Sequence, residues 1–91
     1  MTVTVYTKHR CEPCRATKRW LDERGIPYEE KDTAEPVNLE EAKAFGYLGA
    51  PVVVFVPAPG ESVSHWYGFR PDMLGAVAEA MGKTQKVKEA A

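Results

Sequence analysis

The sequence predicts an α/β fold in the order β-α-β-α-β-β-α, with one four-stranded mixed sheet flanked by three helices. Residues 2–6 (TVTVY) alternate with the period of two that is typical of a strand. Residues 51–56 (PVVVFV) form an almost continuous apolar run, which indicates a strand buried on both faces. A β-α-β start requires a right-handed parallel crossover, and a hairpin then adds antiparallel neighbours. Together these features indicate a single mixed sheet.

A first helix is expected over residues 13–24. Ala16, Trp20 and Leu21 recur on one face, and charged residues occupy the rest of the surface. Pro13 is tolerated only in the first turn, where its missing N–H has no partner to lose. The helix therefore begins at the cysteine pair, and a glycine follows its end.

The middle of the chain predicts a short strand and a second helix. The strand covers residues 26–32 (IPYEEKD). Asn38 and Glu41 fit a variant of the capping box, with a helix running to about Phe45 and ended by Gly46.

A hairpin and a last helix complete the domain. Residues 51–67 read as two strands joined by the turn sequence PAPGES, and a glycine breaks the second strand. Pro71 fits the first position of a helix whose apolar residues recur every four positions, namely Met73, Val77 and Met81. We expect one domain over residues 1–82, followed by a polar tail over residues 83–91.

Composition excludes several classes of protein. A chain of 91 residues with net charge −1 lacks the basic excess of a general nucleic-acid binder. Its apolar start is too short for a signal peptide, and no stretch approaches the roughly 20 apolar residues of a membrane span. We therefore expect a cytoplasmic protein that binds neither nucleic acid nor membrane, and we expect a monomer.

The two cysteines allow three interpretations. A structural disulfide is disfavoured, because such bonds are rare in the cytosol and one between Cys11 and Cys14 closes a very small loop. A zinc site needs four ligands, and the spacing of the remaining candidates, His9 and His65, matches no zinc finger or ribbon. A metal cluster shared between two chains remains an alternative, because each chain of a dimer can contribute its cysteine pair. Otherwise no metal site is expected.

The redox interpretation explains more of the pattern. Free N–H groups at a helix N-terminus stabilise a thiolate, which lowers a cysteine pKa below its usual value of about 8.5. We expect Cys11 to be an exposed nucleophile and Cys14, one turn further in, to resolve the mixed disulfide. Lys8 and Arg10 can stabilise the thiolate and steer an acidic partner segment. Glu12 opposes the thiolate and has no explanation at this level.

Three stretches resemble a known family. "TKHRCEPC" and "GAPVVV" resemble the cysteine motif and the cis-proline segment of the thioredoxin/glutaredoxin superfamily, and "HWYGFRPD" resembles the signature of the NrdH redoxins. The resemblance implies a thioredoxin/glutaredoxin-like fold and a cis bond between Ala50 and Pro51, whose preceding backbone pairs with substrate. It also implies a partner surface next to the cysteines, shaped by four residues: Trp66, Gly68, Phe69 and Arg70. For Trp66, filling the edge of the core is an equal alternative.

The resemblance also implies a function. NrdH redoxins donate electrons to class Ib ribonucleotide reductase and are recharged by NADPH through thioredoxin reductase. On this basis the protein carries no bound cofactor, and its redox group is the Cys11–Cys14 disulfide. Glu12 and Pro13 depart from the family pattern, which often has a hydrophobic residue followed by Gln. A glutathione-dependent glutaredoxin, a mycoredoxin-like enzyme and a CxxC carrier of a metal or cluster remain alternatives.

Overall fold

The computed structural model describes residues 1–58 and 60–82 and confirms the expected α/β order. The first four elements are β1 (Thr2–Thr7), α1 (Glu12–Glu23), β2 (Glu29–Asp32) and α2 (Pro36–Lys43). The last three are β3 (Val52–Val56), β4 (Ser64–Tyr67) and α3 (Pro71–Ala80). The expected tail lies outside the described residues. Among the described residues no helix is long and apolar enough to cross a membrane.

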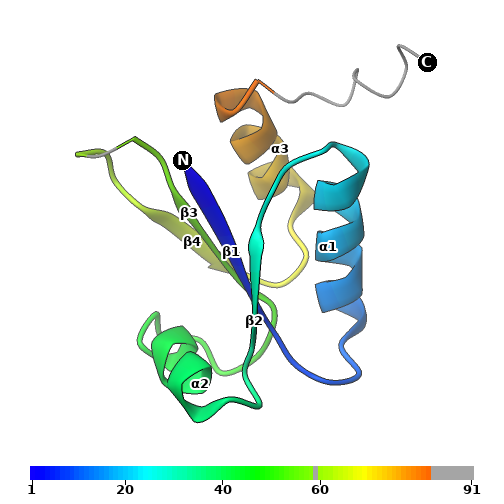
Figure 1. Ribbon diagram of the computed structural model, residues 1–91, viewed down its shortest axis with the longest axis vertical. Helices are drawn as coiled ribbons and strands as arrows, with labels where there is room; N and C mark the ends of the chain where they lie inside the picture. Colours follow the sequence, from blue (N-terminus) through cyan, green and yellow to red (C-terminus); the bar gives the residue numbers. More distant parts are fainter. Residues whose placement is uncertain (59, 83–91) are drawn as a thin grey trace.

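One mixed sheet forms the centre of the molecule (Figure 1). Its strand order is β2-β1-β3-β4, with β1 and β2 parallel and the other two pairs antiparallel. This is the right-handed β-α-β unit plus hairpin that the element order requires. Strands β1 and β3 are therefore central, so the loops at one end of both strands lie next to each other.

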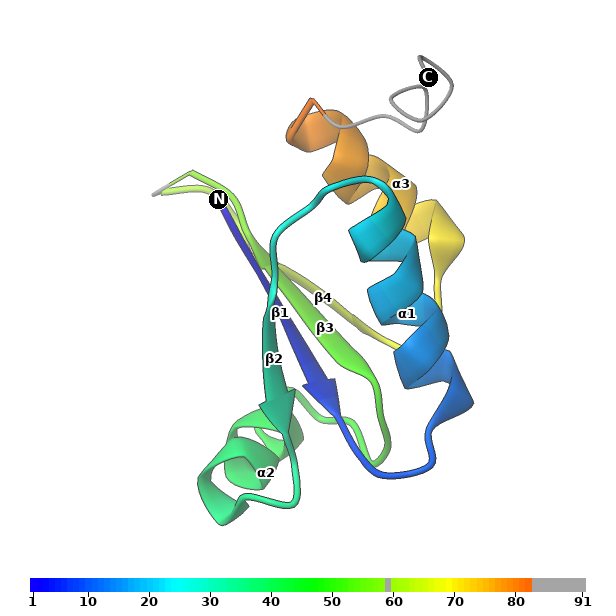
Figure 2. The same ribbon diagram turned by 45° about the vertical axis from the view of Figure 1, so that its right-hand side comes forward.

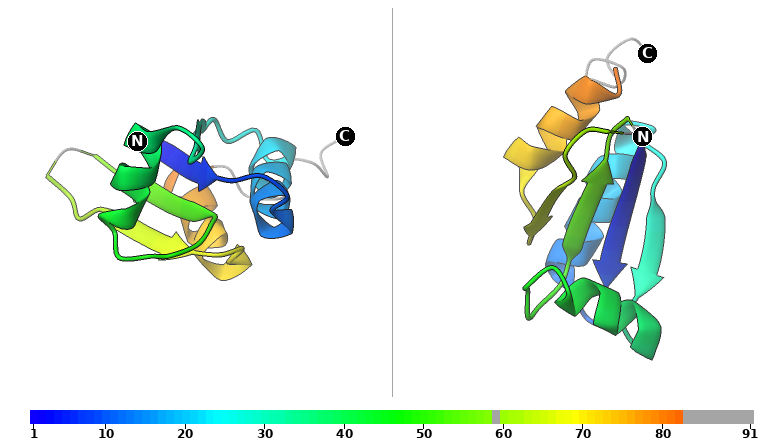
Figure 3. Two further views of the ribbon diagram at one scale, coloured as in Figure 1. Left: turned by 90° about the horizontal axis from the view of Figure 1, so that it is seen from below. Right: turned by 90° about the vertical axis from the view of Figure 1, so that its left-hand side faces the viewer.

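Helices cover both faces of the sheet. Figures 1 and 2 show α1 and α3 on one side, while α2 lies across one end of the sheet on the other side, as the right-hand view of Figure 3 makes clear. Under α1 and α3 the core contains Val5, Leu21, Val53 and Leu74, all fully buried. Under α2 a smaller cluster joins Ala42 to residues of β1 and β3. The apolar run of β3 is thus buried on both faces, as its sequence indicates.

The buried face of α1 differs from the expected one. Cys14, Thr17 and Leu21 are buried, whereas Ala16 and Trp20 are only half-buried. Trp20 packs at the margin of the core, and the Arg24 guanidinium lies 3.7 Å from its ring centroid. The buried face of α1 is rotated from the predicted one because the small side chains of Cys14 and Thr17 occupy the positions closest to the sheet.

Strand β2 and helix α2 also differ from expectation. Strand β2 is only four residues long, because Glu29–Asp32 is the part that pairs with β1. The predicted capping box of α2 is wrong: the helix begins at Pro36, and the Asn38 amide instead donates to the Asp32 carbonyl at 3.0 Å. Glu41 accepts hydrogen bonds from Tyr6 (2.9 Å) and from Lys31. Tertiary partners therefore take both side chains that a capping box would use.

Candidate functional site

The cysteine pair lies at the N-terminus of α1. Cys11 is the N-cap residue, with extended backbone angles, and Cys14 lies in the first turn. The two residues form a disulfide, with their Cα atoms 5.2 Å apart. Pro13, in the first turn, supplies the φ that starts the helix without losing an N–H partner. The expected position of both cysteines is confirmed.

Backbone groups surround the Cys11 sulfur. The Cys14 N–H donates to Cys11 Sγ at 3.1 Å, which uses one of the unpaired donors of the helix start. The Ala50 carbonyl oxygen lies 3.7 Å from the same sulfur. Negative charge on Cys11 Sγ would therefore be stabilised by a directed N–H and by the N-terminal end of the helix dipole.

Burial of Cys11 corrects one expectation. Cys11 is only 5% exposed and Cys14 only 1%, so the predicted exposed nucleophile is wrong for this disulfide form. Ala50 packs with both cysteines in one buried cluster, and Pro51 beside it is also fully buried. The peptide bond between Ala50 and Pro51 is cis, as the family resemblance implies. Ala50 is 39 residues away from Cys11 in the sequence, so a local pattern around the cysteines does not predict that Ala50 covers Cys11.

Charged side chains, mostly basic, surround the cavity next to the disulfide. This cavity of about 230 Å³ is lined by both cysteines, by His9, by the carboxylates of Glu30 and Asp32, and by four basic residues, namely Lys8, Arg10, Arg15 and Lys18. Lys8 and Arg10 form no ion pair within residues 1–58 and 60–82. They are therefore available to a thiolate or to a partner.

Glu12 now has a structural explanation. Its carboxylate accepts a hydrogen bond from the Arg15 guanidinium at 2.7 Å, one helical turn away. Both side chains are largely exposed, at 80% for Glu12 and 57% for Arg15. The charge that opposes a thiolate on Cys11 is thus compensated by a cation of the same helix.

Strand β2 adds a carboxylate that the sequence interpretation missed. Glu30 lines the cysteine cavity, where it accepts hydrogen bonds from Lys18 at 2.9 Å and from Thr7 at 3.0 Å. The Lys18 hydrogen bond holds the pKa of the Glu30 carboxyl below its ordinary value. Only the parallel pairing of β1 and β2 brings Glu30 to this place.

Strand β4 and the segment after it contribute differently from the expectation. Trp66 is 3% exposed and belongs to the core, so its ring does not offer the expected partner surface. The Gly68 N–H donates to the Pro51 carbonyl at 2.9 Å, and its φ of 92° favours glycine. Phe69 stays 37% exposed. The Arg70 guanidinium donates twice to Asp72 (3.1 and 2.9 Å), which lowers the pKa of that carboxyl.

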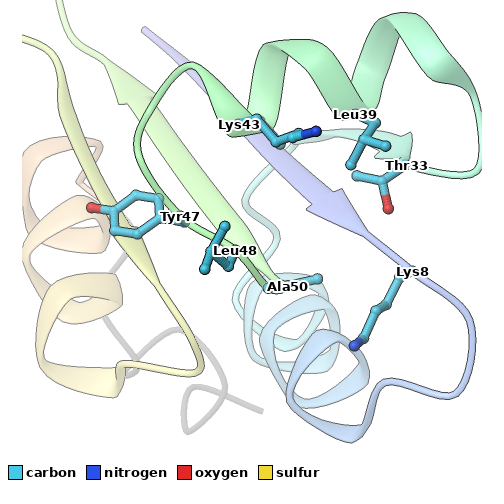
Figure 4. A pocket seen from close by; sticks show the side chains of 9 residues that line it. Lys8, Thr33, Leu39, Lys43, Tyr47, Leu48 and Ala50 are labelled. Atoms are coloured by element: carbon cyan, nitrogen blue, oxygen red, sulfur yellow. The ribbon is translucent and has the colours of Figure 1, made fainter.

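A second cavity of about 190 Å³ adjoins Ala50 (Figure 4). Loop 47–50, helix α2 and the end of β1 surround it. The sequence interpretation did not single out its residues Lys43, Tyr47 and Leu48. Leu48 is 99% exposed, and a leucine in the loop just before the predicted cis-proline was the signal available in the sequence.

Metal ligands do not gather in the described residues. Within 1–58 and 60–82 there is no group of three or more His, Cys, Asp or Glu side chains that could hold a metal ion. His65 Nδ1 lies 3.0 Å from the Tyr47 hydroxyl, and the His65 ring packs against the Phe45 ring, with the ring centroids 5.0 Å apart. His9 and His65 therefore do not complete a ligand set with the cysteine pair in this structure.

Comparisons with known proteins agree with this geometry. Residues 3–56 match the glutaredoxin family. The glutaredoxin-like protein NrdH of Escherichia coli K12 is 36% identical over 81 residues, which covers 88% of this chain and 93% of that protein. NrdH of Lactococcus lactis is 34% identical over 77 residues, covering 84% and 99%. The solved NrdH-redoxin of E. coli, described as having a thioredoxin-like activity profile, superimposes with a TM-score of 0.70 at 35% identity over 85% of this chain and 95% of that one.

Proposed function

Because the chain belongs to the glutaredoxin family and, within it, to the NrdH redoxins, we propose that it carries electrons from thioredoxin reductase to a class Ib ribonucleotide reductase. The chain is a thiol-disulfide oxidoreductase whose redox group is the Cys11–Cys14 disulfide. NADPH is the ultimate electron source. The protein acts in the cytoplasm as a monomer. The observation that carries this function is the cysteine pair at a helix N-terminus, covered by Ala50 and Pro51.

The reaction proceeds by two thiol-disulfide exchanges. The Cys11 thiolate attacks one sulfur of the target disulfide, a mixed disulfide forms, and the other target sulfur leaves as a thiolate that takes up a proton. The Cys14 thiolate then attacks Cys11 Sγ, and the remaining target sulfur leaves and is protonated. The target gains two electrons and two protons, and the Cys11–Cys14 disulfide is the oxidised product.

The surroundings of the pair suit each step. The Cys14 N–H and the start of α1 stabilise the Cys11 thiolate. Cys14, with 1% exposure, is protected from outside reagents and lies within one turn of its target sulfur. The Ala50 backbone beside Cys11 Sγ offers pairing groups to an extended substrate segment. Lys8 and Arg10 add a positive field, which salt weakens.

A choice between two reductases tests the proposal. The oxidised protein is supplied with NADPH and thioredoxin reductase, and NADPH consumption is followed with a class Ib ribonucleotide reductase as acceptor. We expect sustained turnover, which Cys11→Ser abolishes and which Arg19→Gln, an exposed change on the outer surface of α1, leaves intact. Cys14→Ser should accumulate the mixed disulfide, detected by mass. Turnover only with glutathione and glutathione reductase would instead identify a glutaredoxin.

A further inference from the structure

The cavity beside Ala50 is connected to the disulfide through two residues. The Ala50 carbonyl oxygen lies 3.7 Å from Cys11 Sγ, and the residue also lines the cavity. Lys8 lines both this cavity and the one that contains the cysteines. A segment that leaves the target disulfide alongside residues 48–50 therefore enters the cavity within a few residues, because an extended chain advances about 3.3 Å per residue.

Two exposed apolar side chains line the cavity. Leu48 is 99% exposed and Leu39 is 40% exposed, so both can be covered by a partner. Tyr47 is held in place by its hydroxyl contact with His65 and by stacking on Tyr67, with the ring centroids 6.1 Å apart. A Cβ at Gly49 would lie 2.8 Å from the Tyr67 ring, so this glycine lets the loop pack closely against β4. The loop that carries Leu48 is thus held against β4.

Two lysines also line the cavity. Lys8 follows the end of β1 and Lys43 ends α2, and Figure 4 shows them on different sides of the opening. Neither lysine forms an ion pair within the described part of the chain. No Asp or Glu is among the described residues that line the cavity. Two cations without an ion pair, on a concave surface that no carboxylate lines, are complementary to a carboxylate, while the chain as a whole has net charge −1.

We propose that this cavity binds an acidic residue in the extended partner segment that carries the target disulfide. The carboxylate pairs with Lys43, Lys8 adds to the positive field of the cavity, and a neighbouring apolar side chain contacts Leu48 or Leu39. The contact selects among disulfide substrates by charge close to the reacting sulfur. This inference rests on the proposed function, since it assigns a recognition element to the substrate of the same disulfide.

Two matched peptides test the contact. Each carries the same intramolecular disulfide, and they differ only in having Glu or Gln two residues before the first cysteine. The reduced protein is mixed with each peptide, and the second-order rate constant of peptide reduction is measured at about 0.02 M and about 0.5 M salt. The readout is the ratio of the Glu rate to the Gln rate. It is determined for the unmodified protein, for Lys43→Gln and for the control Arg19→Gln, which removes the same charge from α1 outside the cavity.

We expect a ratio of about two to five at low salt, which is the range of exposed to partly enclosed ion pairs. Lys43→Gln should bring the ratio close to one, Arg19→Gln should preserve it, and high salt should abolish it. A ratio of one in the unmodified protein overturns the inference. An equal fall of the ratio in Lys43→Gln and Arg19→Gln also overturns it, because it would show that only the overall positive charge matters.

Oxidised glutathione is the remaining competitor for the cavity. If it inhibits reduction of the Glu peptide, and if Lys43→Gln relieves that inhibition, the cavity takes glutathione and the inference is wrong. Failure of the inference is distinguishable from failure of the proposed function. Reduction of both peptides at equal rates contradicts only the acidic contact, whereas absence of turnover with thioredoxin reductase contradicts the function.

Discussion

The ion pair between Glu12 and Arg15 predicts how the thiolate of Cys11 responds to charge. The two side chains meet at 2.7 Å and are both largely exposed. Replacing Glu12 by Gln removes the charge that opposes the thiolate and leaves Arg15 uncompensated, so the thiolate should become more favourable. Replacing Arg15 by Gln leaves Glu12 uncompensated and should have the opposite effect. The double variant should return close to the starting value.

The magnitude follows from exposure. Charge pairs in contact with water contribute about 0.2–1 kcal/mol, because solvent screens them and their side chains lose freedom on pairing. Each single change should therefore alter the ratio of thiolate to thiol at a fixed pH by a factor of about 1.4 to 5. Glu12→Gln should raise this ratio and Arg15→Gln should lower it.

Thiolate absorbance of the reduced protein measures this ratio. A Cys14→Ser background assigns the signal to Cys11, and Glu40→Gln, an exposed change on α2, is the charge-matched control for Glu12→Gln. An increase of more than about tenfold in Glu12→Gln would refute the reasoning, since it would require an unscreened carboxylate. Two single variants that shift the ratio in the same direction would also refute it.

Three further predictions concern the fold. Leu21→Ala should lower the free energy of urea unfolding of the oxidised protein by about 2–5 kcal/mol, because Leu21 is 0% exposed in the main core; a loss below about 1 kcal/mol would contradict this packing. The Lys18 hydrogen bond lowers the pKa of Glu30 below 4.5, so its contribution to stability is present above that pH and is lost as pH falls through the lowered value. Lys18→Gln should flatten this acid-dependent loss in thermal unfolding, and an unchanged pH profile would argue against the bond. Burial, followed by the nearby Asp22 charge, raises the pKa of Tyr28 from 10.0 to about 12. The contribution of neutral Tyr28 to the free energy of unfolding is therefore complete below pH 10 and is lost as the pH rises towards 12. Ultraviolet titration of the phenol, with Tyr28→Phe as reference, checks this value, and ionisation near 10 would disprove it.

Local patterns were sufficient for the type and order of the elements and for the position of the cysteines. Alternation in residues 2–6, the apolar run in residues 51–56 and the position of Pro13 each act over a few residues, so they can be read without knowledge of the fold. The same holds for Cys11 at the N-cap of α1, because a proline is tolerated in the first turn of a helix. The cis bond before Pro51 needed the family resemblance in addition, since an X–Pro bond is usually trans.

Only the tertiary structure decided which side chains are buried and which meet. Trp66 lies in the core because β4 pairs it with Val53, whose side chain faces α1 and α3; a shift of one residue would have turned it outward. Cys11 is buried because Ala50, 39 residues away, is brought over it by the central position of β3. Lys43 reaches the cavity beside Ala50 only through the placement of α2 across the end of the sheet. Such contacts depend on strand register and on long-range packing, which no short window of sequence contains.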